Sequence, residues 1–132
     1  MPCAVYREMP HVMTTEDINE IIDGYRLSAR YSREGGLDGV EVHGMSHGYL
    51  LNQFLSPATN FRKDNFGGSL VNRMRIVTEI LEATRAEIGP EMIMGMRINS
   101  DDGHEGGLSP DEWADIAKEF EETGLILSLI HI

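Results

Sequence analysis

Residues 39–73 read GVEVHGMSHGYLLNQFLSPATNFRKDNFGGSLVNR. The first part of this stretch alternates valine with polar residues, at Val40 and Val42, as a half-buried β-strand does. A long polar loop follows, which contains two histidines and a tyrosine, and a Gly-Gly-Ser run at 67–69 then begins a helix. Strand, loop and helix in this order form the repeating unit of an α/β barrel. In such barrels the catalytic side chains lie just beyond the C-terminal ends of the strands.

The flanking sequence continues this alternation in both directions. Thr14 and Asp17 have the spacing of a helix N-cap pair, and Ser109 followed by Pro110 and Glu112 is a second strong helix start. Alternation of this kind predicts a parallel sheet with helices outside it. The expected elements are a helix from Thr14 to the glycine pair at 35–36, a strand over 37–43, a helix from Ser69 to Gly89, a strand over 91–98, a helix from Ser109 to Gly124, and a third strand beginning at Leu125.

The length of the chain limits how much of a barrel it contains. It has 132 residues, whereas a complete (β/α)₈ barrel typically has about 250. We therefore expect an α/β fold that is a segment of a (β/α)₈ TIM barrel, with about three β/α units. In this interpretation 1–132 is a single partial barrel domain: 1–13 are loop, 14–124 hold the barrel units, and 125–132 are the start of a further strand or an atypical tail. Three strands cannot close a barrel, so exposed sheet edges are expected.

Composition excludes several classes of partner. The formal net charge of -11 argues against binding to nucleic acid or to an anionic membrane surface. The single cysteine, Cys3, excludes an internal disulfide framework and a cysteine-rich metal site. The sequence has no apolar run near the roughly 20 residues that a membrane span requires, and no secretory signal is visible. A soluble cytoplasmic protein is the expectation.

Side-chain alternation along the two predicted strands assigns their faces. Glu41 and His43 point to one side of the first strand, and the valines between them point to the other. In a barrel the outer side packs on apolar helices, which leaves Glu41 and His43 in the interior, with His43 at the mouth. The same logic for 91–98 directs Arg97 into the mouth, above Gly95. The alternate positions, Met94, Met96 and Ile98, then belong to the core.

Two longer motifs lie in 39–73. The first comprises two histidines followed by Gly-Tyr-Leu and Gln-Phe-Leu-x-Pro, here His43, His47, 48–50 and 53–57. The second has the pattern N-x-R-x-D-x-(F/Y)-G-G-S-x-x-N-R, here Asn60, Arg62, Asp64, Phe66, Gly67, Gly68, Ser69, Asn72 and Arg73. With these motifs the chain resembles the old yellow enzyme family, the FMN-dependent ene-reductases and NADH:flavin oxidoreductases. The resemblance extends from about residue 10 to residue 124.

The resemblance implies a cofactor, a reaction and four site residues. The cofactor is FMN, the electron donor is NADH or NADPH, and the acceptor is an activated C=C bond. His43 and His47 then correspond to the pair that donates hydrogen bonds to the substrate oxygen and stabilises negative charge there. Tyr49 corresponds to the proton donor, since a phenol keeps its proton at pH 7 as a general acid must. Arg97 corresponds to the arginine at the pyrimidine edge of FMN.

The spacing of the two histidines departs from the family pattern. They are usually three residues apart, and here His43 and His47 are four apart. One residue must bulge between them, and we expect the bulge at Met45 or Ser46.

Structural roles are the alternatives for the same residues. His43 fits a hydrogen-bonded strand end, Tyr49 fits loop packing, and Arg97 fits an ion pair with Glu41. Holding the long loop onto the barrel is the expected role of Asn60, Arg62, Asp64, Asn72 and Arg73.

Two other function classes stay open. The pair His43 and His47 permits a zinc site, with Asp101, Asp102, His104 or Glu105 as further ligands. An i, i+4 metal pair normally lies on a helix, and the glycines at 44 and 48 disfavour one, so no metal is expected. The chain could also be a non-catalytic barrel fragment that does not bind flavin by itself, since the barrel phosphate site usually comes from loops after strands 7 and 8. An oligomer is compatible with either interpretation.

Overall fold

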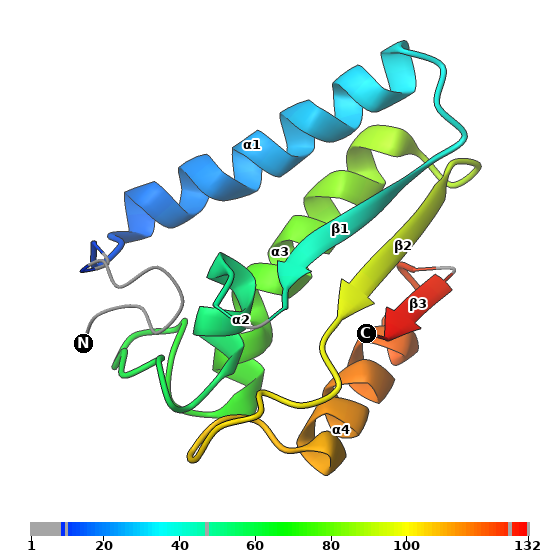
Figure 1. Ribbon diagram of the computed structural model, residues 1–132. Helices are drawn as coiled ribbons and strands as arrows, with labels where there is room; N and C mark the ends of the chain where they lie inside the picture. Colours follow the sequence, from blue (N-terminus) through cyan, green and yellow to red (C-terminus); the bar gives the residue numbers. More distant parts are fainter. Residues whose placement is uncertain (1–8, 10, 47, 127, 132) are drawn as a thin grey trace.

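The computed structural model describes residues 9, 11–46, 48–126 and 128–131. Three strands form one sheet in the order β1-β2-β3, and both pairings are parallel. Helices connect the strands, as Figure 1 shows. The elements are α1 (Thr15–Glu34), β1 (Gly39–Met45), α2 (Leu50–Leu55), α3 (Leu70–Ile88), β2 (Ile93–Ile98), α4 (Pro110–Glu122) and β3 (Ser128–His131).

The predicted alternation of helices and parallel strands is confirmed, but some bounds were wrong. The first two strands begin two residues later than expected, at Gly39 and Ile93. The short helix α2 was not predicted. It follows Tyr49, whose side chain makes no capping hydrogen bond, so the usual N-terminal signal is absent.

Side-chain caps explain where the long helices start. The Thr14 side chain accepts the backbone N–H of Asp17, whose carboxylate accepts the N–H of Thr14 in return. Ser109 and Glu112 form the same reciprocal box at α4. Such boxes satisfy two backbone donors that the first helical turn leaves without partners. Both predicted helix starts are therefore confirmed.

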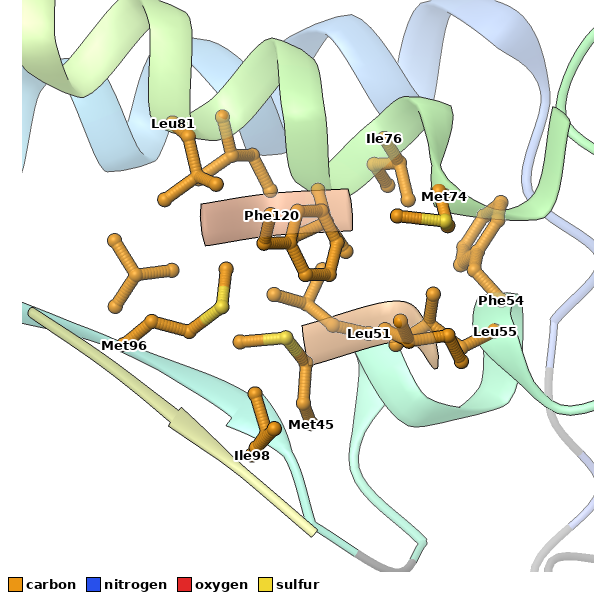
Figure 2. Close-up of a cluster of buried hydrophobic side chains, with 14 of the residues drawn as sticks. Met45, Leu51, Phe54, Leu55, Met74, Ile76, Leu81, Met96, Ile98 and Phe120 are labelled. Carbon is orange, nitrogen blue, oxygen red and sulfur yellow. The ribbon is translucent and has the colours of Figure 1, made fainter. Parts of the chain in front are cut away.

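The core lies between the sheet and the helices. Met94, Met96 and Ile98 on β2 are fully buried, as their alternation predicted. Figure 2 shows Met96, Ile98 and Met45 extending from the strands toward α3, with side chains of α2 beside them. α4 adds Trp113, Ile116 and Phe120, which are also buried. Each such side chain contributes about 1.5–3 kcal/mol through burial.

A β-bulge interrupts the pairing of β1 with β2. Val42 lies opposite Met96 and Met45 lies opposite Ile98, so β1 has one residue more than β2 over this interval. The extra residue therefore lies at His43 or Gly44, and the expected position at Met45 or Ser46 was wrong. Gly44 takes a φ of 130°, which disfavours any residue with a Cβ. Met45 has no exposed surface, so it must keep its place in the core.

The face of the sheet away from the core is open in the part of the chain that the structure describes. Glu41 is exposed, and Ile93 keeps 52% of its surface accessible. Among the described strands, β1 and β3 are each paired on one side only, which agrees with the expectation for three strands of a barrel. A search of the described helices finds none that is long and apolar enough to cross a membrane.

Candidate active site at the mouth of the sheet

His43 and Tyr49 lie together at the C-terminal end of β1. Their ring centroids are 5.2 Å apart and the ring planes are inclined by 80°, which is an edge-to-face contact. The His43 Nδ1 atom is buried and has no hydrogen-bond partner among the described residues. Tyr49 keeps 42% of its surface accessible. The pair therefore combines an accessible phenol with a buried polar ring atom that has no partner in the described part of the chain.

Tyr25 of α1 holds the backbone at this point. Its hydroxyl donates a 2.7 Å hydrogen bond to the carbonyl oxygen of His43, within the bulge. Burial raises the pKa of Tyr25 above its usual value, so the hydroxyl stays a donor over a wide pH range. From its helical spacing, Tyr25 is predicted only to lie on the apolar face of this helix, with no partner for its hydroxyl. The signal that this prediction misses is that a buried tyrosine hydroxyl usually needs a partner.

Arg97 and Glu41 form an ion pair on the open face of the sheet. The Arg97 Nε atom lies 2.9 Å from Oε1 of Glu41, and their side chains are 39% and 33% exposed. The contact lacks hydrogen-bond geometry, so Nε has no hydrogen-bond partner among the described residues. The predicted pairing of Arg97 with Glu41 is confirmed. Gly95 lies opposite Glu41 in the pairing of the strands, and it adds no side chain to this face.

The predicted second histidine lies outside the described residues. His47 therefore stays a prediction, together with the idea that two imidazoles bind one oxygen. The zinc alternative includes His47 and therefore also stays untested; within the described part of the chain, no group of three or more His, Cys, Asp or Glu is arranged to hold a metal. The Asp102 carboxylate instead accepts hydrogen bonds from Asn52, Trp113 and Leu108.

The long loop before α3 is held by the side chains that the second motif contains. Asn60 Nδ2 donates to the carbonyls of Phe54 and Phe66, at 2.6 Å and 2.7 Å. Arg62 forms a two-pronged pair with Asp64, and this hydrogen bonding holds the pKa of the Asp64 carboxyl below its usual value.

A second set of bonds fastens the loop to its neighbours. Arg62 also donates to the carbonyl of Met13, and Arg73 donates to the carbonyls of Leu55 and Gly68. The Asn72 side chain donates to the Gly67 carbonyl. The structural role predicted for these motif residues is therefore confirmed.

Comparison with known proteins identifies the family of this arrangement. Residues 2–130 match the sequence profile of the NADH:flavin oxidoreductase / NADH oxidase family. The chain belongs to this family. N,N-dimethylglycine/sarcosine dehydrogenase of Chromohalobacter salexigens is 41% identical over 122 residues, which are 92% of this chain and 17% of the relative.

Solved structures agree with the family assignment. The complex of 2-naphthoyl-CoA reductase with 2-naphthoyl-CoA is 38% identical, with a TM-score of 0.88 over 99% of this chain and 20% of that one. The old yellow enzyme homologue from Zymomonas mobilis is 27% identical, with a TM-score of 0.81 over 95% of this chain and 35% of that one. The predicted resemblance and the predicted fold class, a segment of a TIM barrel, are both confirmed.

Family membership also defines the cofactors. Members of the NADH:flavin oxidoreductase / NADH oxidase family depend on FMN and use NADH or NADPH, as the motifs implied. The chain spans only 17% of the length of the dehydrogenase and 20% of the reductase.

Proposed function

We propose that these strands carry the substrate-binding and proton-donating part of an FMN-dependent oxidoreductase that reduces an activated C=C bond. The observation that carries the proposal is the contact of His43 with Tyr49. A buried Nδ1 atom, to which no described residue hydrogen-bonds, meets an accessible phenol at a strand end, which is where barrel enzymes place their chemistry. NADH or NADPH is the electron donor in this proposal, in agreement with the family.

His43 is proposed to bind the substrate oxygen. A hydrogen-bond donor aimed at this oxygen stabilises the negative charge that develops there during reduction, and loss of one such donor typically lowers the rate about 10²–10³-fold. Burial of the Nδ1 atom supports this role, because a donor in a site that excludes water interacts more strongly with charge. His47 is proposed as the second donor.

Tyr49 is proposed as the group that delivers a proton to the α-carbon. Its accessibility supports the role, since a proton donor must reach the substrate. Its contact with His43 also supports the role, because a substrate oxygen bound by His43 would then lie near the phenol.

Arg97 fits the requirement for a cation next to FMN. Its guanidinium is partly exposed on the open face, and its Nε has no hydrogen-bond partner among the described residues. Gly95, which lies opposite Glu41, adds no side chain to that face. When bound, FMN supplies the hydride. Arg97 would hold its pyrimidine edge and favour negative charge there, while Glu41 keeps the arginine extended.

The proposed substrate is a small molecule whose double bond is conjugated to an oxygen-bearing group, such as an enone, an enoyl thioester or a nitroalkene. The role of His43 requires this oxygen. The relative that was solved with 2-naphthoyl-CoA binds a molecule of this kind, an acyl thioester.

An FMN titration of the purified chain, followed by flavin fluorescence, tests the cofactor half of the proposal. We expect micromolar binding that Arg97→Ala weakens about tenfold or more, as loss of a charged hydrogen bond does. Lys118→Ala is the matched control, because it removes one positive charge from an exposed pair on α4. Absence of binding at high FMN would instead support the alternative, a fragment that does not bind flavin by itself.

Reduction of an enone by the FMN-loaded chain tests the catalytic half. Tyr49→Phe removes only the hydroxyl, and we expect the rate to fall about 10²–10⁴-fold while FMN affinity is unchanged. Tyr31→Phe is the control, since Tyr31 is an exposed tyrosine on α1. Equal rates for both variants would rule out Tyr49 as the proton donor.

A further inference from the structure

A buried carboxylate lies beneath the mouth of the sheet and takes no part in the roles assigned so far. Asp102 follows β2, and only 4% of its surface is accessible. One carboxylate oxygen accepts hydrogen bonds from the Asn52 side chain at 2.9 Å and the Trp113 indole at 3.2 Å. The other accepts the backbone N–H of Leu108 at 2.8 Å. Asp102 therefore joins α2, α4 and the loop after β2.

The network keeps the Asp102 carboxyl ionised. Burial alone raises its pKa, but the hydrogen bonding of the carboxylate, in which the Leu108 N–H contributes most, outweighs burial, and the pKa lies below its usual value. The loop is tight around it, because a Cβ on Gly107 would lie 2.6 Å from the Asp102 Cβ. The carboxylate is thus a fixed acceptor rather than a flexible one.

Asn52 connects this carboxylate to the turn before α2. Its side-chain oxygen accepts the backbone N–H of Gly48 at 3.4 Å, while its amide nitrogen donates to Asp102. The next side chain, Gln53, donates to the Gly48 carbonyl at 3.0 Å. Both polar backbone groups of Gly48 are therefore held by α2. Gly48 precedes Tyr49, so this turn sets where the phenol lies.

Other contacts also hold this turn and α2: the Tyr49 N–H donates to the Ser46 carbonyl at 3.0 Å, and Leu51 and Leu55 are buried in the core. α2 has only six residues, and isolated helices shorter than about 12–15 residues are marginal in water. Its position must therefore come from tertiary contacts. Asp102 provides one at the buried side of α2, and it reaches that side from the loop that directly follows the strand of Arg97.

We propose that Asp102 is a positioning residue for the turn that carries Tyr49, and that it acts through Asn52 and Gly48. This inference rests on the proposed role of Tyr49 as proton donor. The connection runs from the Asp102 carboxylate to the Asn52 amide and from there to the Gly48 N–H. Asp102 touches neither substrate nor cofactor in this role.

Two variants of similar severity separate positioning from general stability. Asn52→Leu keeps the branched arrangement of four side-chain heavy atoms but cuts the link to Gly48, and it leaves Asp102 bonded to Leu108 and Trp113. Trp113→Phe also removes one donor from Asp102, but it leaves the link through Asn52 intact. Asp102→Asn removes the charge. The reciprocal pair Asp102→Asn with Asn52→Asp restores a carboxylate–amide hydrogen bond in the opposite sense.

The readout is the Tyr49 ring signal in NMR spectra of the chain labelled on tyrosine, assigned by its loss in Tyr49→Phe. We expect Asn52→Leu and Asp102→Asn to shift this signal away from its position beside the His43 ring, and to speed amide exchange across 48–53 about tenfold or more. Trp113→Phe should change neither the Tyr49 signal nor the amide exchange rates, and the reciprocal pair should return both to their values in the parent.

These measurements need no bound flavin, so they test the inference even where the proposed activity fails. A Tyr49 signal that stays in place in Asn52→Leu would overturn the inference, as would an equal shift in Trp113→Phe. Where Asp102→Asn does not fold, the comparison of Asn52→Leu with Trp113→Phe decides. In the active chain, the same variants should lower turnover without changing FMN affinity.

Discussion

Replacing Asn60 with alanine should remove much of what holds the long loop to the barrel. Asn60 Nδ2 donates to the carbonyls of Phe54 and Phe66, and its Oδ1 accepts the N–H of Arg62 at 3.1 Å. Each such bond contributes about 1 kcal/mol net. The three together predict that Asn60→Ala lowers the free energy of unfolding by about 3 kcal/mol. A urea m-value of about 2 kcal/mol/M converts this to a midpoint shift of about 1.5 M.

Urea unfolding followed by fluorescence measures this shift, because Trp113 is the only tryptophan in the sequence and is buried. Asn65→Ala is the matched control, since Asn65 is an exposed asparagine of the same loop, and it should change the free energy by less than about 0.5 kcal/mol. Asn60→Asp keeps the acceptor but loses both donors, so most of the loss should remain. Equal midpoints for Asn60→Ala and Asn65→Ala would refute the assignment of these bonds.

Three further predictions concern the backbone near the mouth and its charges. Tyr25→Phe removes the bond to the His43 carbonyl and should lower the free energy of unfolding by about 1 kcal/mol. Because the pKa of Tyr25 is raised in the folded state, its contribution to stability is fully present below pH 10.0 and is lost as pH rises through the folded pKa. In urea titrations at alkaline pH, the free energy of unfolding should therefore fall more steeply with pH for the parent than for this variant. Gly44→Ala imposes a Cβ at a φ of 130° and should lower the free energy of unfolding by about 1–3 kcal/mol. Gly24→Ala, at a helical position with open space around it, should raise the free energy of unfolding by about 0.5–1 kcal/mol. Changes of the same sign in thermal unfolding of both variants would contradict backbone strain at position 44. Because the pKa of Asp102 is lowered in the folded state, its contribution to stability is present above pH 3.8 and is lost as pH falls through the folded pKa. On acidification, the free energy of unfolding should therefore fall more steeply with pH for the parent than for Asp102→Asn.

Local sequence patterns predicted the helix starts and strand faces, because residues close in the sequence determine these features. The capping pair of Thr14 and Asp17 and the start of α4 at Ser109 are formed by residues three positions apart, so the sequence displays them directly. Alternation along β2 likewise predicted that Met94 and Met96 face the core. Alternation also directed His43 and Arg97 to the mouth, but the roles predicted for these two residues and for Tyr49 came from the family motifs, because no local rule distinguishes them from structural residues.

Local sequence patterns did not predict contacts between residues that are far apart in the sequence. Asn52 and Asp102 are 50 positions apart, and only the folded chain brings them together. Sequence analysis considered Asp102 only as a metal ligand, since an acidic loop shows its charge but not its partners. α2 was missed for a related reason, because six residues without a side-chain cap depend on tertiary contacts for their helical form.

Because of the bulge, the number of residues in β1 can differ from the number in β2 while the paired core residues keep their positions. Val42 and Met45 stay opposite Met96 and Ile98 whether two residues or one lie between them, because the bulge absorbs the difference. Loss of a single codon at this point would give an uninterrupted ladder and bring the two histidines of the motif one residue closer. The bulge therefore keeps Met45 level with Ile98 in the core while β1 carries one residue more than β2 toward the mouth.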